Sequence, residues 1–243
     1  MIEVDGISKR FKDVVAVDGV SFSARDGRIT GLLGENGAGK STTLRSIATI
    51  LRPDSGRVCI DGTDVGIDPA GARRRLGVLP HSSGLYARLT GRENIRYFGE
   101  LNGIGGAQLE QRIDELSATL EIGDFIDRRT EGFSHGQKMK IALARALVHD
   151  PRNVVLDEPT NGLDVLATRA LRDVIRRLRD EGRCVLFSSH VMQEVAALCD
   201  DIVIIHAGRR VTEGSPDALR EQTGESDLEE AFVTIITGAE ARA

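Results

Sequence analysis

The sequence contains no tryptophan, only three cysteines and no long run of apolar residues. Cys59, Cys184 and Cys199 form no Cys-x-x-Cys pair, so the sequence predicts no disulfide framework and no zinc site and favours reduced thiols in a cytoplasmic protein. No stretch approaches the roughly 20 apolar residues that a membrane-spanning helix needs, and we expect no signal peptide at Met1–Asp5. Any role at a membrane is therefore expected to be peripheral.

An excess of basic residues is also lacking. The net charge is −5 and the sequence pI is near 5.6, so we expect no nucleic acid to bind across the surface through its phosphates. The composition is 40% hydrophobic and 28% charged, which excludes a disordered or fibrous chain. The length of 243 residues allows one large domain with its own core, or at most two small ones.

Short β-rich runs alternate with helical patterns along the chain, which predicts an α/β fold. A mainly helical block between about residues 89 and 148, interrupted at Gly103–Gly106, is interpreted as a subdomain inserted into the α/β core. The predicted strands lie at residues 28–30, 57–62, 76–80, 153–157 and 184–189, with a final hairpin at 201–205 and 208–211, and the clearest helices lie at 41–48 and 167–181.

The strongest local signal is the run Gly34-Glu35-Asn36-Gly37-Ala38-Gly39-Lys40-Ser41, which fits the pattern Gly-x4-Gly-Lys-Ser/Thr between a predicted strand and a predicted helix. The glycines allow backbone N–H groups to surround a phosphate, and the helix N-terminus adds positive potential. We expect Lys40 to hold the β- and γ-phosphates of a nucleotide and the Ser41 hydroxyl to bind Mg²⁺. The alternative is a glycine-rich turn that binds nothing.

Acidic and imidazole side chains follow two other buried strands. Asp157 and Glu158 come at the carboxyl end of an apolar strand, where ligands of α/β sheets bind. Asp157 suits Mg²⁺ through a water molecule, and Glu158 suits the role of general base for an attacking water. His190 follows the next buried strand at the same edge. Taken alone, the acidic pair also fits a surface turn, and the histidine also fits a structural residue.

Together these residues resemble the ATP-binding cassette (ABC) ATPases in order along nearly the whole chain. Gly34–Thr42 matches the Walker A loop, Val154–Glu158 the Walker B strand, Gly162–Asp164 the D-loop and His190 the switch histidine. The resemblance implies that ATP and Mg²⁺ are the cofactors and that Glu158 and His190 are catalytic. It implies nucleotide binding by Phe11, which would stack on the adenine, and by Gly34, Asn36, Gly37, Ala38, Gly39, Lys40, Ser41 and Thr42, with metal binding by Ser41 and Asp157.

The signature motif of this family is matched by Ser134-His135-Gly136-Gln137 at the start of a predicted helix. A serine and a glycine at a helix start present N–H donors and a hydroxyl to an anion. In the family this group binds the γ-phosphate held by a second subunit, so the resemblance implies that two copies of the chain enclose two ATP molecules. Hydrolysis would then loosen the dimer and convert phosphate chemistry into motion.

Two positions depart from the family pattern. His135 stands where the signature commonly has glycine, so it adds bulk and an ionisable group beside the phosphate site. His81 stands at the Q-loop position after Leu79-Pro80, where the family has a glutamine that touches magnesium and relays the nucleotide state to the membrane partner. Because each ring nitrogen of histidine can donate or accept one hydrogen bond, we expect hydrolysis to survive the change at His81.

The resemblance also implies a domain organisation. We expect a P-loop NTPase (RecA-like) core with an antiparallel β subdomain and an inserted α-helical subdomain. Residues 1–220 are predicted to form a single ABC ATPase domain that contains the helical subdomain at about residues 85–148. Residues 221–243 are predicted to form a short tail helix packing on or next to the core.

Two further segments are similar to the ABC-2-type exporters, in particular the sodium-efflux (NatA-type) ATP-binding subunits. These are Gly84–Asn94, directly after the Q-loop position, and the tail Asp227–Gly238. The tail also fits a plain amphipathic helix that says nothing about the branch. In this branch the chain would lie on the cytoplasmic face of the membrane and contact a separate permease near residues 81–93. The nearby cluster Arg73–Arg75 fits a solvated helix face, or a contact with lipid or permease.

The main hypothesis is therefore an ATP-hydrolysing subunit of an exporter whose cargo is sodium, a drug or a lipid. The alternative is a soluble, non-transport ABC ATPase acting on the ribosome or nucleic acid. Proteins of that second class usually have two cassettes or a long coiled-coil insertion, whereas this chain has one cassette and a net negative charge. A P-loop kinase is a third possibility, but it would not explain Ser134–Gln137.

Overall fold

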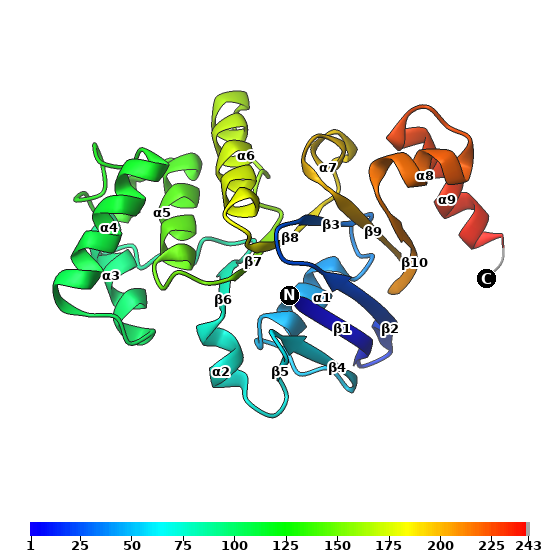
Figure 1. The fold of residues 1–243 in the computed structure, drawn as a ribbon, viewed down its shortest axis with the longest axis horizontal. Helices are drawn as coiled ribbons and strands as arrows, with labels where there is room; N and C mark the ends of the chain where they lie inside the picture. Colours follow the sequence, from blue (N-terminus) through cyan, green and yellow to red (C-terminus); the bar gives the residue numbers. More distant parts are fainter. Residues whose placement is uncertain (242–243) are drawn as a thin grey trace.

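The computed structural model describes residues 1–241, which form two β-sheets with helices around them (Figure 1). The larger sheet has six strands in the order β10-β9-β3-β8-β7-β6. Its neighbouring strands are parallel except for the edge strand β10, which is antiparallel to β9. The strands are β3 (Ile29–Leu33), β6 (Leu76–Leu79), β7 (Asn153–Asp157), β8 (Cys184–Ser189), β9 (Asp201–His206) and β10 (Arg209–Gly214).

The smaller sheet is antiparallel, with the strand order β2-β1-β4-β5. Its strands are β1 (Ile2–Phe11), β2 (Val14–Ala24), β4 (Ser55–Ile60) and β5 (Thr63–Asp64). The sequence pattern did not single out β1 and β2, because the pairing of β1 with β2 shifts register between Val4 and Ile7 and so interrupts the alternation of apolar and polar residues. The mixed α/β fold with a parallel and an antiparallel sheet confirms the predicted fold class.

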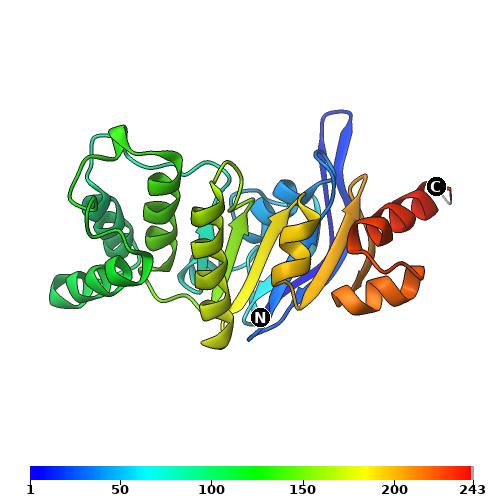
Figure 2. The ribbon, with the colours of Figure 1, turned by 90° about the horizontal axis from the view of Figure 1, so that it is seen from above.

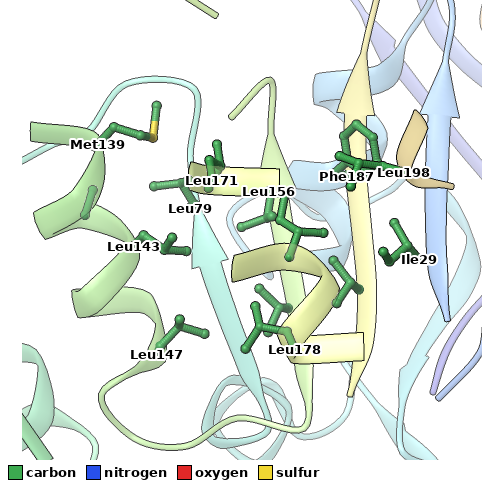
Figure 3. Packing of buried hydrophobic residues seen from close by; sticks show 14 of the residues in the cluster. Ile29, Leu79, Met139, Leu143, Leu147, Leu156, Leu171, Leu178, Phe187 and Leu198 are labelled. Atoms are coloured by element: carbon green, nitrogen blue, oxygen red, sulfur yellow. The ribbon is translucent and has the colours of Figure 1, made fainter. Parts of the chain in front are cut away.

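Every residue of β3, β7 and β8 is buried, because the parallel sheet is covered on both faces. Successive side chains point to opposite faces, so Phe187 and Leu156 lie in one apolar core (Figure 3) while Leu186 and Val155 lie in a second. Figure 2 shows α6 and α7 over one face, with α1 and the antiparallel sheet behind the other. The parallel strands can therefore carry apolar side chains on both faces.

Of the α-helices outside residues 85–148, four lie between strands in the chain, and α8 and α9 follow the last strand, β10. The helices are α1 (Lys40–Ile47), α2 (Pro69–Arg74), α6 (Val165–Asp180), α7 (Met192–Leu198), α8 (Pro216–Thr223) and α9 (Leu228–Glu240). The sequence pattern does not predict α2, α7 and α8, because these helices have only six to eight residues and so show little periodicity. No helix within residues 1–241 is both long and apolar enough to cross a membrane.

Three helices lie between β6 and β7 in the chain and form the end of the molecule at the left of Figure 1. They are α3 (Gly91–Leu101), α4 (Gly106–Leu120) and α5 (His135–Leu147). α3 begins with a capping box between Thr90 and Glu93, and the chain turns between α3 and α4 at Gly103, which has a φ of 83°. These helices share buried residues with the core over the parallel sheet, and we propose to treat residues 85–148 as an inserted helical subdomain.

The end of the chain folds back onto the core. Helix α9 contributes Phe232, Ile235 and Ile236 to the apolar core that also contains Leu198 of α7. The segment for which we predicted a tail helix, residues 221–243, contains α9 and the end of α8, and its residues 242 and 243 lie outside the described part of the chain.

The parallel sheet is sensitive to the loss of a central side chain. Phe187 of β8 is fully buried, so we expect Phe187→Ala to lower the free energy of unfolding by about 3–5 kcal/mol through lost burial and a residual cavity. Ile67→Ala is the matched control, because Ile67 is 84% exposed, and we expect a change within about 0.5 kcal/mol. Urea unfolding followed by circular dichroism measures both. Equal losses in the two variants would contradict the assigned core.

Candidate functional site

The glycine-rich loop of residues 34–39 connects the end of β3 to the start of α1. Gly34 and Gly39 have no room for a side chain, because a Cβ would lie 2.3 Å from the carbonyl oxygen of Ile205 and 2.5 Å from that of Ala16, respectively. Gly37 and Gly39 also have φ values of 85° and 105°, which glycine adopts readily. The fold therefore requires these glycines, and the loop leads directly into the N-terminus of α1, where N–H groups are available to an anion.

The side chain of Lys40 spans this loop. Its Nζ donates to the carbonyl oxygens of Gly34 at 2.7 Å and Glu35 at 3.0 Å, and the residue is 4% exposed. Burial lowers the pKa of Lys40, while the nearby carboxylates of Glu158 and Asp157 act in the opposite direction. An ammonium group is thus held inside the loop, beside the acidic pair at the end of β7.

Asp157 ends β7 and is joined to α1 and to β8. The Ser41 hydroxyl donates to Asp157 Oδ1 at 3.2 Å, so the structure brings together the two residues for which we predicted metal binding. The hydroxyl of Ser188 donates to the same oxygen at 2.7 Å and accepts the N–H of Glu158 at 3.0 Å. Ser188 therefore fixes both acidic residues from the neighbouring strand.

The carboxylate of Glu158 lies among three basic side chains. Its Oε1 is 3.7 Å from Lys40 Nζ and 3.3 Å from His190 Nδ1, and its Oε2 is 3.8 Å from His81 Nδ1. The Glu158 side chain is 12% exposed, whereas those of His190 and His81 are 40% and 52% exposed. The Glu158 carboxylate is thus largely buried, whereas the two histidines beside it are partly exposed to solvent.

The loop that carries His81 is fixed from the helical segment. The Arg145 guanidinium of α5 donates to the carbonyl oxygens of Ser83 at 2.7 Å and Gly84 at 2.9 Å, and it lies 4.5 Å from the ring centre of Phe98. Burial lowers the pKa of Arg145. His81 therefore lies between Glu158 and a stretch of the loop that is hydrogen-bonded to α5.

The signature residues lie at the start of α5. Ser134 and Gln137 form a capping box, in which the Ser134 hydroxyl accepts the N–H of Gln137 at 3.2 Å and the Gln137 side chain accepts the N–H of Ser134 at 3.0 Å. The hydroxyl proton of Ser134 can still donate to an anion. No hydrogen bond or ion pair within residues 1–241 joins the residues Ser134–Gln137 directly to the side chains around Glu158.

His135 contacts the loop that follows Glu158. Its Nε2 lies 2.9 Å from the carbonyl oxygen of Asn161, and since a carbonyl only accepts, Nε2 must carry the proton. The ring also lies 3.5 Å from the position that a Cβ on Gly162 would take. A glycine at position 135 could not make this bond, so the departure from the family pattern connects α5 to the D-loop of the same chain.

The other predicted residues lie around this arrangement. Phe11 ends β1 with its ring 46% exposed and Lys9 Nζ 5.9 Å from the ring centre. The Asp164 side chain caps α6 by accepting the N–H of Ala167 at 2.8 Å. Asn36, Gly37 and Ala38 lie within the loop before α1, and Thr42 lies in its first turn.

The sequence patterns identify most of the residues around Glu158, but they do not single out the hydroxyl groups that bind the neighbouring carboxylates. Ser188 and Ser189 are polar residues in an otherwise apolar buried strand, and that departure was a usable signal. Glu194, a buried carboxylate in α7, was also missed, since a single glutamate in a short helix resembles a surface residue.

Comparison with known proteins supports one family. A family profile described as ABC transporter matches residues 17–161. The chain is 43% identical to the ABC transporter ATP-binding protein NatA of Bacillus subtilis (strain 168), over 96% of this chain and 97% of that protein. It is 37% identical to the Nod factor export ATP-binding protein I of Rhizobium sp. (strain N33), over 91% of this chain and 73% of that protein.

Solved structures show the same architecture. An ATP-binding subunit of an ABC transporter superposes with a TM-score of 0.90 at 30% identity and covers 97% of this chain and 99% of its own. A dimeric bacterial ABC transporter cassette superposes with a TM-score of 0.82 at 25% identity, covering 88% of this chain and 98% of its own. The chain belongs to the ABC transporter family, and it is an ATP-binding subunit with the ATPase activity of that family.

Proposed function

We propose that the chain binds ATP with Mg²⁺ at the loop before α1 and hydrolyses it beside Glu158. In this proposal Lys40 binds the β- and γ-phosphates, and Phe11 stacks on the adenine. Glu158 accepts a proton from the attacking water, and His190 holds Glu158 and the terminal phosphate in place. The observation that carries the proposal is the position of Glu158 within 4 Å of both Lys40 and His190.

The oxygen donors at the start of α1 and at the end of β7 fit Mg²⁺. The Ser41 hydroxyl and the Asp157 carboxylate are adjacent oxygen donors, which are the ligands that Mg²⁺ prefers. Mg²⁺ usually takes one or two such protein ligands and completes its shell with phosphate oxygens and water. Ser41 and, through water, Asp157 would hold the ion, which supplies positive charge to the phosphates during hydrolysis.

We also propose that two copies of the chain enclose two ATP molecules. Among residues 1–241, no hydrogen bond or ion pair joins Ser134–Gln137 to the side chains around Glu158, and the hydroxyl proton of Ser134 is available to the phosphate of a second copy. Val165 and Leu166, directly after Asp164, are 83% and 79% exposed. Large apolar side chains exposed together favour burial against another protein surface.

The proposed task of the dimer is to drive export through a separate membrane permease of the ABC-2 type, from the cytoplasmic face of the membrane. Similarity to NatA and to a Nod factor export protein supports this assignment. A groove of about 470 Å³ between the parallel sheet and the helical segment supports a permease contact. Its lining includes Ile50 and Leu101, which are 66% and 64% exposed, and the cations Arg73 and Arg74. The proposed cargo is sodium, or else a drug or lipid.

Reconstitution tests the export proposal. The chain and a candidate ABC-2-type permease are placed in vesicles, and movement of ²²Na⁺ is measured after MgATP is added. Leu101→Asp places a charge in the groove, so we expect it to abolish co-purification with the permease and transport while leaving ATP binding unchanged. Ile67→Asp, exposed outside the groove, is the control and should retain both. Co-purification with ribosomes and not with a permease would contradict the proposal.

Removal of the proposed general base should separate binding from turnover. We expect Glu158→Gln to lower kcat by about 10²–10⁴-fold, because the amide cannot accept the proton from water. Calorimetry should give an ATP Kd close to that of the wild type, and gel filtration should reveal a dimer that depends on MgATP. Wild-type turnover in this variant would exclude Glu158 as the base.

The histidine at the Q-loop position is tested by the family's own residue. His81 Nδ1 lies 3.8 Å from Glu158, beyond a hydrogen bond, so we expect Glu158 to keep its place in His81→Gln. The variant should therefore hydrolyse ATP at the wild-type rate or faster in a phosphate-release assay. A collapse of the rate would mean that the imidazole does something that an amide cannot do.

A further inference from the structure

Glu194 accepts hydrogen bonds from two segments of the chain, one that follows Glu158 and one that precedes His190. It is only 7% exposed, in the first turn of α7. Its Oε2 accepts a hydrogen bond from the Thr160 hydroxyl and a second one, 3.3 Å long, from the Ser189 hydroxyl. Thr160 follows Glu158 by two residues, and Ser189 directly precedes His190. One buried carboxylate oxygen therefore joins the segments that carry the two proposed catalytic side chains.

The hydrogen bonds around Glu194 have a fixed direction. The Ser189 hydroxyl accepts the N–H of Val191 at 2.9 Å, which leaves its proton for Glu194. The charge of the carboxylate is balanced from α6, where Arg172 Nη2 lies 3.9 Å from Glu194 Oε1. A buried carboxylate is costly without such partners. The network therefore places Glu194 at one position between α6, α7 and the two loops.

The segment held by Glu194 includes a residue with an unfavourable backbone conformation. Glu158 has a φ of 50°, in the left-handed region that a residue with a Cβ adopts only at a cost. Such conformations persist where the surroundings fix the chain. Here the Glu158 N–H is bound by Ser188, the Glu158 carbonyl accepts the N–H of Asn161 at 3.2 Å, and Thr160 between them is bound by Glu194.

We propose that Glu194 is a positioning residue for ATP hydrolysis. By binding Thr160 and Ser189 at once, it holds Glu158 and His190 at the 3.3 Å separation observed between Oε1 and Nδ1. In the described part of the chain no hydrogen bond or ion pair joins Glu194 to either side chain, so it would act through the two loops. The inference rests on the roles proposed above for Glu158 and His190, and it adds a residue that sets their geometry.

The main variant is Glu194→Ala in the full 243-residue chain. It leaves the hydroxyls of Thr160 and Ser189 without their acceptor, so both loops lose a common anchor. Because small misplacements of reacting groups can cost about 10²-fold in rate, we expect kcat to fall by about 10-fold or more. The ATP Kd from calorimetry should stay within about two-fold, because the loop around Lys40 is separate from this network. In Glu194→Gln the amide oxygen can still accept both hydrogen bonds, so most of kcat should return.

A double variant separates positioning from a merely structural role. If Glu194 acts through His190, then adding Glu194→Ala to His190→Ala should lower kcat little further, since the geometry that it fixes is already lost. Thr30→Val is the control, because Thr30 is a fully buried threonine of β3 whose hydroxyl has no hydrogen-bond partner within residues 1–241, and it should retain wild-type kcat. Melting temperatures of all variants establish that the folded protein is compared.

Thr160→Val and Ser189→Ala keep the inference testable if Glu194→Ala does not fold. Each removes one hydroxyl from Glu194, and we expect each to lower kcat at nearly constant Kd. Folded Glu194→Ala with kcat within two-fold of the wild type would overturn the inference, as would multiplicative losses in the double variant or wild-type rates in both hydroxyl variants. A wild-type chain that hydrolyses no ATP would instead remove the proposed roles of Glu158 and His190 themselves.

Discussion

The site depends on the burial of one ammonium group beside two carboxylates. Lys40 is almost fully buried and donates to two carbonyl oxygens of its own loop, with Glu158 3.7 Å away. In a low-dielectric position each of these charges needs partners, which the glycine loop and the acidic pair supply to one another. This constraint requires the loop before α1 and the end of β7 to meet, and the parallel sheet provides the edge at which they do.

Neutral hydroxyls link the carboxylates of this region to the surrounding strands and loops. Ser41 and Ser188 donate to Asp157, while Thr160 and Ser189 donate to Glu194. A hydroxyl can accept and donate at once, so it links two groups without adding a charge that would have to be balanced. Strands β7 and β8 are neighbours in the sheet, so these hydrogen bonds fix the segment after β7 relative to the segment after β8.

The two histidines that depart from the family pattern lie on connections between the helical segment and the sheet. His135 at the start of α5 donates to the loop after Glu158, and His81 lies between Glu158 and a loop held by Arg145. Both contacts connect the helical segment to the residues around Glu158. The proposed export function would need such a connection for phosphate chemistry to move a membrane partner.

The sequence by itself determined the α/β class, the glycine loop, the acidic pair and the signature, because each depends on residue types at short, fixed spacing. The short, mainly apolar strands, such as Asn153–Asp157, could also be predicted from the sequence. Only the tertiary structure decided which distant groups meet: Ser188 beside Asp157, Glu194 between two loops, and His135 on the carbonyl of Asn161. These contacts depend on strand order and helix packing, which short-range patterns do not encode.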